Sequence, residues 1–309
     1  MKSLAPGQGG ATDRLEPDFG NQPLEVQAGM PIERHPAVSG LFYPEAPEAL
    51  RADLRSRLEE ADKRAGAGSE REQAGAERAA PKALIVPHAG YVYSGSIAAS
   101  AYRQLAPAAD TVRRVVLFGP SHRVRVRGLA LPAAQSFVTP LGTVPVDADA
   151  VAAALALPQV VQSDAAHALE HSLEVQLPFL QTVLSRFSIV PFAVGEATAG
   201  DVAQVIELLY GGPETLIVVS SDLSHYHPYR EACRIDEASM QAVLSLTATL
   251  GYEQACGAPA INGLLLAARR HGLQPKLLDL RNSGDTAGDR LRVVGYAAFS
   301  FADASHGRH

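Results

Sequence analysis

Beyond residue 80, short apolar runs rich in β-branched residues alternate with longer helical patterns, and this alternation most constrains the fold. It is typical of a layered α/β architecture. The predicted strands are 83–87, 114–119, 188–194, 215–221, 275–280 and 291–301. The predicted helices are 95–105, 147–156, 169–185, 200–210, 228–249 and 258–272. Several strands are apolar throughout, as expected for strands buried on both faces, so we predict a three-layer α/β/α sandwich around a mostly parallel mixed sheet.

Two segments lack the apolar periodicity of a packed core. Residues 1–30 are rich in Gly, Pro, Gln and charge, and residues 61–80 interleave Ala and Gly with charges of both signs. Such segments cannot bury enough apolar surface to offset the entropy of ordering. We therefore predict a disordered leader at 1–30, a single α/β domain at 31–303 with a surface insertion at about 61–80, and a flexible tail at 304–309.

Composition excludes several classes of function. The formal net charge of -6 gives no general electrostatic reason for nucleic acid to bind. The two cysteines cannot build a disulfide framework, so we expect a cytoplasmic protein. The first residues lack the apolar core of a signal peptide, and no apolar stretch is long enough to span a membrane. We also expect no nucleotide cofactor.

Polar side chains follow directly after several predicted strands. His88 follows the strand 83–87, and His122 follows 114–119. Asp222 and His225 follow 215–221, and Asp285 closes a polar run after 275–280. In open α/β sheets, ligands bind outside the carboxyl ends of the strands, because loops converge there. The shared placement predicts a functional site at this edge of the sheet.

Two neutral imidazoles and one anionic side chain form the ligand set of non-haem iron sites. The anion candidates are Asp222, Cys256, Glu170, Glu174 and Asp285. Cys256 stands immediately before the predicted helix 258–272, and a helix N-terminus lowers the pKa of a thiol, which makes it a plausible metal ligand. The other cysteine, Cys233, lies within the predicted helix 228–249 and is interpreted as a small buried apolar residue.

Tyr91 and Tyr93 follow His88 closely along the chain. They are candidates for stacking on a ligand or for supplying a phenolic proton, and the alternative is packing within the loop. On the predicted helix 169–185, Glu170 and Glu174 share one face, as do His171 and Glu174. We expect these three side chains to lie near the cleft and to orient metal-binding imidazoles through hydrogen bonds.

A competing hypothesis uses a different pair of histidines. His167, Glu170 and His171 satisfy the H-x-x-E-H spacing of zinc metallopeptidases, in which two histidines one helical turn apart bind zinc and the glutamate acts as a base. Against it, no third ligand is obvious downstream, and the histidines at the strand ends are left unexplained.

Several segments together resemble one protein family. They are PHAGYVYSG (87–95), FGPSH (118–122), EHSLEVQLPFLQ (170–181), SSDLSHYH (220–227), the Cys256 turn and NSGD (282–285). They closely resemble the Memo family, whose bacterial and archaeal members are called AmmeMemoRadiSam system protein B. The resemblance extends from about residue 36 to the final strand. It implies a fold like that of the class III extradiol dioxygenases, non-haem iron enzymes that open catechol rings with O₂.

The resemblance also implies roles for individual residues. His88 and His122 match the two metal-binding histidines of the family, and Cys256 matches the cysteine that replaces a glutamate ligand of the dioxygenases. His225 matches the acid/base histidine of those enzymes, and Asp222 matches an aspartate close to the metal. A thiolate is softer than a carboxylate and can itself be oxidised. We expect Fe(II) first and copper second.

Two classes of function follow from this resemblance. The first is a mononuclear metalloprotein with redox or dioxygenase-like chemistry on an unknown substrate, with opening of a catechol ring as the concrete analogy. The second is a non-catalytic protein that uses the same cleft to bind a metal or a peptide. The family name further implies AMMECR1-like and radical SAM protein partners.

Overall fold

The computed structural model describes residues 32–67 and 80–303. In this part of the chain, nine strands form one sheet in the order β10-β12-β2-β9-β3-β8-β4-β7, and β11 pairs with β12 on a separate branch. Their bounds are β2 Ala83–Val86, β3 Arg114–Pro120, β4 Leu129–Leu131, β7 Val160–Gln162, β8 Ser188–Val194, β9 Thr215–Ser220, β10 His225–His227, β11 Leu273–Asn282 and β12 Val293–Asp303.

The centre of the sheet is parallel. β9 pairs in parallel with both β2 and β3, and β3 pairs in parallel with β8, so these strands end at the same edge. β12 runs antiparallel to β2, and β4 runs antiparallel to β8. The predicted mixed, mostly parallel sheet is confirmed.

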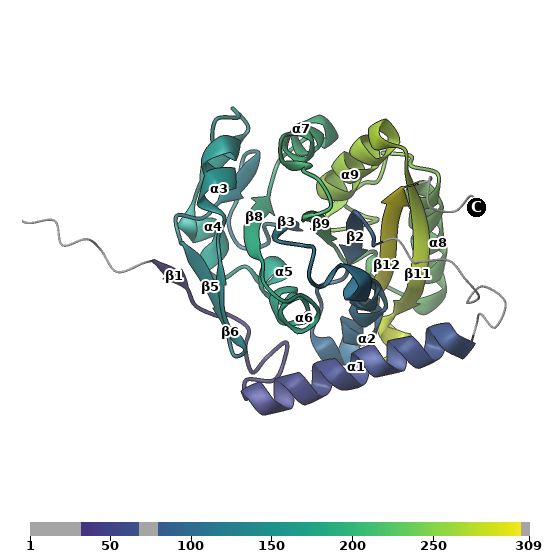
Figure 1. The fold of residues 1–309 in the computed structure, drawn as a ribbon. Coiled ribbons are helices and arrows are strands. Elements are labelled where there is room, and N and C mark those ends of the chain that lie inside the picture. The colour runs from purple at the N-terminus through teal and green to yellow at the C-terminus, as the bar shows by residue number, and fades with distance from the viewer. Residues whose placement is uncertain (1–31, 68–79, 304–309) are drawn as a thin grey trace, which may run out of the picture. The chain divides into compact units, whose positions relative to one another are not determined.

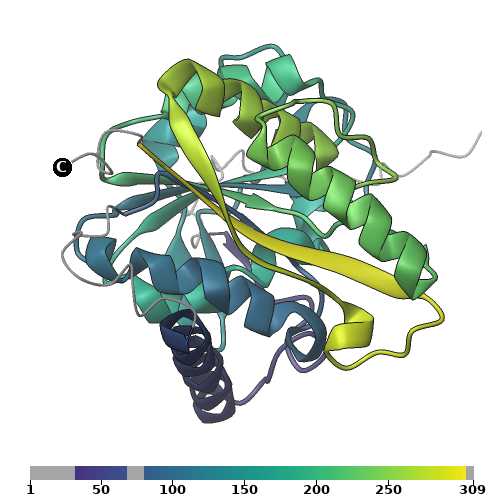
Figure 2. The same ribbon diagram turned by 90° about the vertical axis from the view of Figure 1, so that its right-hand side faces the viewer.

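Helices cover both faces of the sheet (Figures 1 and 2). Leu84 and Val86 of β2 face the layer formed by α1, α2 and α6, whereas Ala83 and Ile85 face the layer that contains α7 and α9. The helices are α1 Pro47–Ala67, α2 Tyr91–Tyr102, α3 Ala148–Ala154, α4 Asp164–Ala168, α5 His171–Glu174, α6 Leu177–Val183, α7 Ala199–Leu209, α8 Tyr229–Leu244 and α9 Ala258–His271. The described residues also contain the 3₁₀ helices η1 Arg103–Ala108 and η2 Ser283–Asp285. The arrangement is the predicted α/β/α sandwich.

The predicted helix 169–185 is two helices, α5 and α6. Pro178 stands in the first turn of α6, where its missing N–H is not needed. Inside a continuous helix, the proline ring would clash with the carbonyl of Glu174. The α-helical hydrogen bonding is therefore interrupted at Val175 and Gln176, although both residues keep helical backbone angles, and the Gln176 side chain lies in the core, where it is 1% exposed.

The remaining helix boundaries follow local chemistry. α2 begins at Tyr91, after Gly90, rather than at residue 95. α9 ends at Gly272, as predicted, because this residue adopts the left-handed conformation with φ 68°. α8 stops at Leu244, short of the predicted residue 249, and Leu246 two residues later has φ 55°.

A small second sheet has the order β1-β5-β6, formed by Glu33–Arg34, Ser136–Thr139 and Gly142–Pro145. Residues 61–67 of the predicted insertion continue α1. The rest of that insertion, the leader and the tail lie outside the described residues. Among the helices that the structure describes, none is both long enough and apolar enough to cross a membrane.

Candidate metal centre

His88 is held from both its backbone and its ring. It follows β2 at the parallel edge of the sheet and is 2% exposed. Its backbone N–H donates to Asp222 Oδ1 at 2.7 Å, and its Nδ1 lies 2.9 Å from the Ser220 hydroxyl. Burial lowers the pKa of His88 well below its usual value, with nearby His122 and His171 acting in the same direction. The imidazole is therefore neutral, as a metal ligand must be.

His122, the second histidine, is hydrogen-bonded to a buried carboxylate. Its backbone N–H and its Nδ1 lie 2.6 and 2.9 Å from the two oxygens of Glu170, which is 1% exposed. A carboxylate can only accept here, so Nδ1 carries a proton, and Nε2 is the ring nitrogen left for a metal. Burial raises the pKa of Glu170, but the hydrogen bonds and charge interaction with His122, together with the hydrogen bond from the Ser172 N–H, outweigh it and lower that pKa to about 2. Glu170 thus orients His122, as expected from the sequence.

The 170–172 turn (Glu170, His171 and Ser172) is close to both histidines. Ser172 N–H donates to Glu170 Oε1 at 2.9 Å, and its carbonyl accepts from Ser220 at 2.6 Å. The turn can approach β3 this closely only because residue 119 is glycine: a Cβ there would lie 2.6 Å from Ser172 Oγ.

Cys256 completes the ligand group. The ring nitrogens of His88 and His122 and the Cys256 sulfur all lie within 4.8 Å of one another. Cys256 Sγ is 3.4 Å from His88 Nε2. With a metal–sulfur bond of about 2.3 Å and a metal–nitrogen bond of about 2.1 Å, two atoms at this separation subtend about 100° at one ion. The donor set fits a single metal ion.

The Cys256 thiol differs from the expectation of a lowered pKa. Burial, followed by the charge of Asp222, raises its pKa to about 12, and these effects outweigh the backbone N–H groups nearby. The N–H of Gly257, at the start of α9, donates to Ser221 Oγ at 2.9 Å. Without a cation the sulfur is a thiol, so binding of a metal would release its proton.

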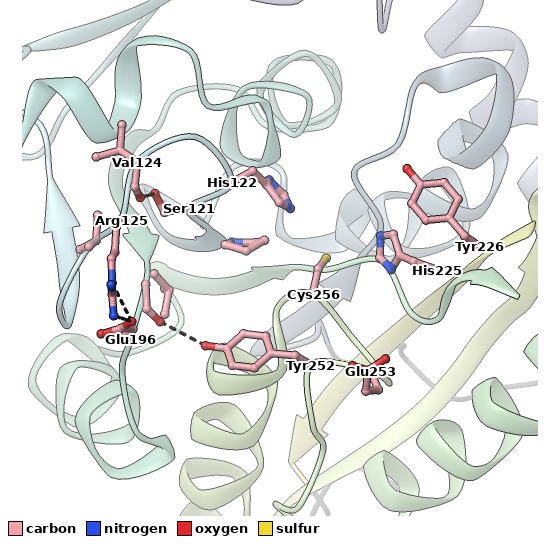
Figure 3. A pocket seen from close by; sticks show the side chains of 14 residues that line it. Ser121, His122, Val124, Arg125, Glu196, His225, Tyr226, Tyr252, Glu253 and Cys256 are labelled. Atoms are coloured by element: carbon pink, nitrogen blue, oxygen red, sulfur yellow. Dashed lines mark hydrogen bonds and ion pairs between the residues drawn. The ribbon is translucent and has the colours of Figure 1, made fainter.

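Asp222 and His225 flank the ligand group, as their sequence positions suggested. Asp222 is 4% exposed, and its Oδ2 lies 3.9 Å from His88 Nε2. Burial raises its pKa, although hydrogen bonds from the backbone oppose this. His225 lies beside Cys256 and borders the same pocket (Figure 3).

A cavity of about 500 Å³ opens onto His122, Cys256 and His225 (Figure 3). Its apolar wall consists of Pro120, Val124, Val126 and Val194. At the rim, Arg125 and Glu196 form an exposed ion pair at 2.6 Å. Tyr226 and Tyr252 also line the cavity, and each is 62% exposed. Tyr226 has φ 61°, a conformation that costs energy for a tyrosine and is common at functional sites.

His171 lies against both ligand histidines. Its ring stacks on His122 with centroids 4.7 Å apart, and it meets His88 edge-on at 5.4 Å. On its other side it contacts Phe42 at 4.8 Å. Its Nδ1 is buried and has no hydrogen-bond partner among the described residues. His171 therefore packs beside the site and does not orient a ligand through a hydrogen bond.

The two predicted tyrosines have different surroundings. Tyr91 lies in the core, which excludes the ligand-facing alternative and agrees with packing, although within a helix and not within a loop. It is 4% exposed, its hydroxyl donates to the Val175 carbonyl at 2.7 Å, and its ring contacts Tyr43 and Phe179. It begins α2, whose inner face packs on the sheet. Tyr93, two residues later, points the other way and is 40% exposed.

Glu174 also differs from its predicted role. Its carboxylate is fully buried and accepts hydrogen bonds from Arg34, from Tyr43 at 2.6 Å and from the N–H groups of Ala37 and Val38. Because α5 turns this side chain away from the histidines, Glu174 anchors the segment 34–43 instead.

Asp285 likewise has a structural role. It accepts from the backbone N–H of Asn282 and from the Tyr229 hydroxyl at 2.6 Å, which closes the turn η2. The second cysteine, Cys233, is exposed on α8 rather than buried.

The geometry excludes the zinc-peptidase hypothesis for His167, Glu170 and His171. Glu170 has extended backbone, so the spacing does not fall on one continuous helix. His167 belongs to α4, and its Nε2 lies 2.9 Å from the Ala130 carbonyl. Glu170 contacts His122 instead, and among the described residues the ligand atoms of Glu170 and His171 gather with His122 and not with His167.

The sequence model described as "Memo-like protein" matches residues 34–300. The chain belongs to the Memo-like protein family. A "MEMO1 family protein" of Archaeoglobus fulgidus is 38% identical over 287 residues, covering 87% of this chain and 99% of the relative. Another from Aquifex aeolicus is 35% identical over 282 residues, covering 87% and 98%. A crystal structure of an uncharacterized protein from Escherichia coli K12 overlaps 70% of this chain and 98% of its own at 12% identity, with a TM-score of 0.45.

Two polar residues that support this Memo-like site were not predicted from the sequence. Ser220 and Gln176 are buried beside His88, and both make hydrogen bonds with the groups that hold it. In the sequence, Ser220 is recognisable only as a polar residue at the end of an apolar strand. Gln176 is recognisable only as a single amide between apolar residues. Neither pattern reveals which distant atom such a side chain will contact.

Proposed function

We propose that this Memo-like protein holds one redox-active metal ion, Fe(II) first and copper second, with His88, His122 and Cys256 as its ligands. The observation that carries the proposal is the convergence of two imidazoles and one thiol within 4.8 Å at the open edge of the sheet. A mixed nitrogen and sulfur set suits iron, copper and zinc and disfavours magnesium or calcium. The further step to redox chemistry rests on the family resemblance and on the open cleft.

When bound, such a metal would supply one-electron chemistry and a Lewis-acidic position for a substrate oxygen. The protein residues have separate tasks. Glu170 holds the His122 ring through Nδ1, and the Asp222 carboxylate holds the His88 loop through its backbone N–H. His225, which borders the cavity, is placed to exchange a proton with a molecule that enters it.

Access distinguishes an enzyme from a metal-sequestering protein. A closed site would surround its ligands with protein, whereas the cavity of about 500 Å³ reaches His122 and Cys256 directly. It has an apolar wall of prolyl and valyl side chains and polar groups at one end. These features favour a small organic substrate with a metal-binding oxygen, and opening of a catechol ring is the concrete reaction to test.

The first experiment measures metal content in untagged protein purified without oxygen. His88→Ala and Cys256→Ser should each lose the metal. The matched controls are His271→Ala, a partly exposed histidine that hydrogen-bonds Glu207, and Cys233→Ser on the exposed surface of α8. Both controls should retain wild-type metal content. Retention of metal in both ligand variants would refute the assignment.

The second experiment measures oxygen uptake by the iron-loaded protein with a panel of catechols. Uptake that depends on the catechol, and that falls in His225→Gln while metal content is unchanged, supports the enzymatic function. Bound metal without turnover of any panel member favours the alternative of a binding protein that uses the same cleft.

A further inference from the structure

We propose that Ser220, oriented by Gln176, is a positioning residue that fixes His88 in its Nδ1–H form and thereby presents the Nε2 lone pair to a metal. The hydrogen-bond partners of Gln176 and Ser220 determine which atom donates and which accepts in each of their contacts, including the contact with His88. The inference concerns the metal-free protein, and only its consequence for affinity rests on the proposed function.

The orientation of the Gln176 amide comes first. Its nitrogen lies 3.0 Å from the Pro87 carbonyl, which can only accept a hydrogen bond. Its oxygen accepts from the Tyr102 hydroxyl at 2.8 Å. A flipped amide would place two carbonyl oxygens against each other at Pro87. The second amide hydrogen therefore points to Ser220 Oγ, at 2.8 Å.

The Ser220 hydroxyl has one hydrogen to donate. Its Oγ lies 2.6 Å from the carbonyl of Ser172, which can only accept, so the hydrogen is used there. One lone pair receives the Gln176 amide. Toward His88 Nδ1, at 2.9 Å, Ser220 is left with a lone pair, so the ring nitrogen must be the donor.

The opposite ring nitrogen agrees with this assignment. His88 Nε2 faces Cys256 Sγ at 3.4 Å, and the single thiol hydrogen can be donated either to the Nε2 lone pair or to the Asp222 carbonyl at 3.6 Å, so a lone pair on Nε2 is compatible with both arrangements. The two ligand histidines therefore share one tautomer but have different supports. Glu170 is a charged acceptor for His122, whereas Ser220 is a neutral acceptor for His88, so His122 should be the stronger electron donor of the two.

The test begins with the tautomer in metal-free protein. Long-range proton–nitrogen NMR correlations of the ¹⁵N-labelled imidazoles distinguish Nδ1–H from Nε2–H, and His88→Gln identifies the signals of His88. We expect Nδ1–H in the wild type. Ser220→Ala should convert His88 to Nε2–H or to a mixture, and Ser220→Thr, which keeps the hydroxyl, should restore Nδ1–H. A wild-type His88 protonated at Nε2 overturns the proposal, even if no variant folds.

The second readout is affinity for Zn²⁺, used as a redox-inert probe. Ser220→Ala should weaken binding about 10- to 100-fold, and Ser220→Thr should restore most of it. Ser100→Ala removes a hydroxyl that bonds Ser96 and Asp279 instead, and should leave the affinity unchanged. Unchanged affinity and tautomer in Ser220→Ala would overturn the proposal. If the wild type binds no Zn²⁺, the metal assignment fails while the NMR result still decides the role of Ser220.

Discussion

Replacing Glu174 by glutamine should destabilise the protein strongly, although the side chain keeps its size. One carboxylate oxygen accepts from the Tyr43 hydroxyl and the Val38 N–H, and the other accepts from Arg34 and the Ala37 N–H. The amide of glutamine has only one oxygen. In either orientation, its NH₂ group therefore faces two donors that were satisfied before, and the Arg34 guanidinium, 6% exposed, loses its counter-charge.

The expected loss is about 3–5 kcal/mol in the free energy of unfolding, the usual range when one partner of a buried ion pair is removed. Urea unfolding of metal-free protein, followed by circular dichroism, measures this loss. Amide hydrogen exchange at Ala37 and Val38 locates it, because their N–H groups donate to Glu174 and should exchange faster in the variant.

Glu48→Gln is the matched control. Glu48 is 90% exposed at its side chain and pairs with Arg51 at 2.8 Å, so its replacement should change the free energy by less than about 0.5 kcal/mol. A Glu174→Gln protein within about 1 kcal/mol of the wild type, with unaltered exchange at Ala37 and Val38, would refute the reasoning.

Three further predictions concern the site and its surroundings. Glu170→Gln should weaken Zn²⁺ binding about 10- to 100-fold by calorimetric titration, because His122 loses its carboxylate acceptor; equal affinity would contradict this. Gly119→Ala should also weaken Zn²⁺ binding, because its Cβ would lie 2.6 Å from Ser172 Oγ and displace the 170–172 turn, and wild-type affinity would show that the turn can shift freely. Burial lowers the pKa of His167 to about 4, below its unfolded value of about 6.5, so the folded state binds fewer protons between these limits. Neutral His167 therefore contributes about 3 kcal/mol to the free energy of unfolding above pH 6.5, and this contribution is lost as the pH falls to 4. In urea unfolding across that range, His167→Gln should lose less stability than the wild type.

Much of the fold was predictable because the sheet strands have an unambiguous composition. The runs at 188–194 and 215–221 are apolar or β-branched almost throughout, and only a strand covered on both faces places such residues favourably. The break at Val175 and Gln176 was missed because the apolar pattern continues through it. Short strands such as β10 were missed because their pairing depends on β12, which is distant in sequence.

The placement of the two histidines at one edge of the sheet was predictable for a topological reason, whereas the choice of Cys256 among five anion candidates came from the family resemblance. Parallel strands end at the same edge, so His88 and His122, which follow β2 and β3 on either side of β9, lie at the same edge of the sheet. Polar residues on helices were harder to place. Glu170 and Glu174 look equivalent in the sequence. Glu170, however, has extended backbone just before α5 and reaches His122, whereas Glu174 lies within α5 and reaches Arg34. The pKa of Cys256 was misjudged because neither the burial of its thiol nor its proximity to Asp222 can be read from the sequence.

The 170–172 turn has a consequence for how this site can change during evolution. The carboxylate of Glu170 supports one ligand histidine, and the carbonyl of Ser172 accepts the hydroxyl that supports the other. Substitutions at the two supports should therefore be epistatic: in a double-mutant cycle, their effects should not add, because both act through three consecutive residues. A lineage that remodels one histidine position must also accommodate the other.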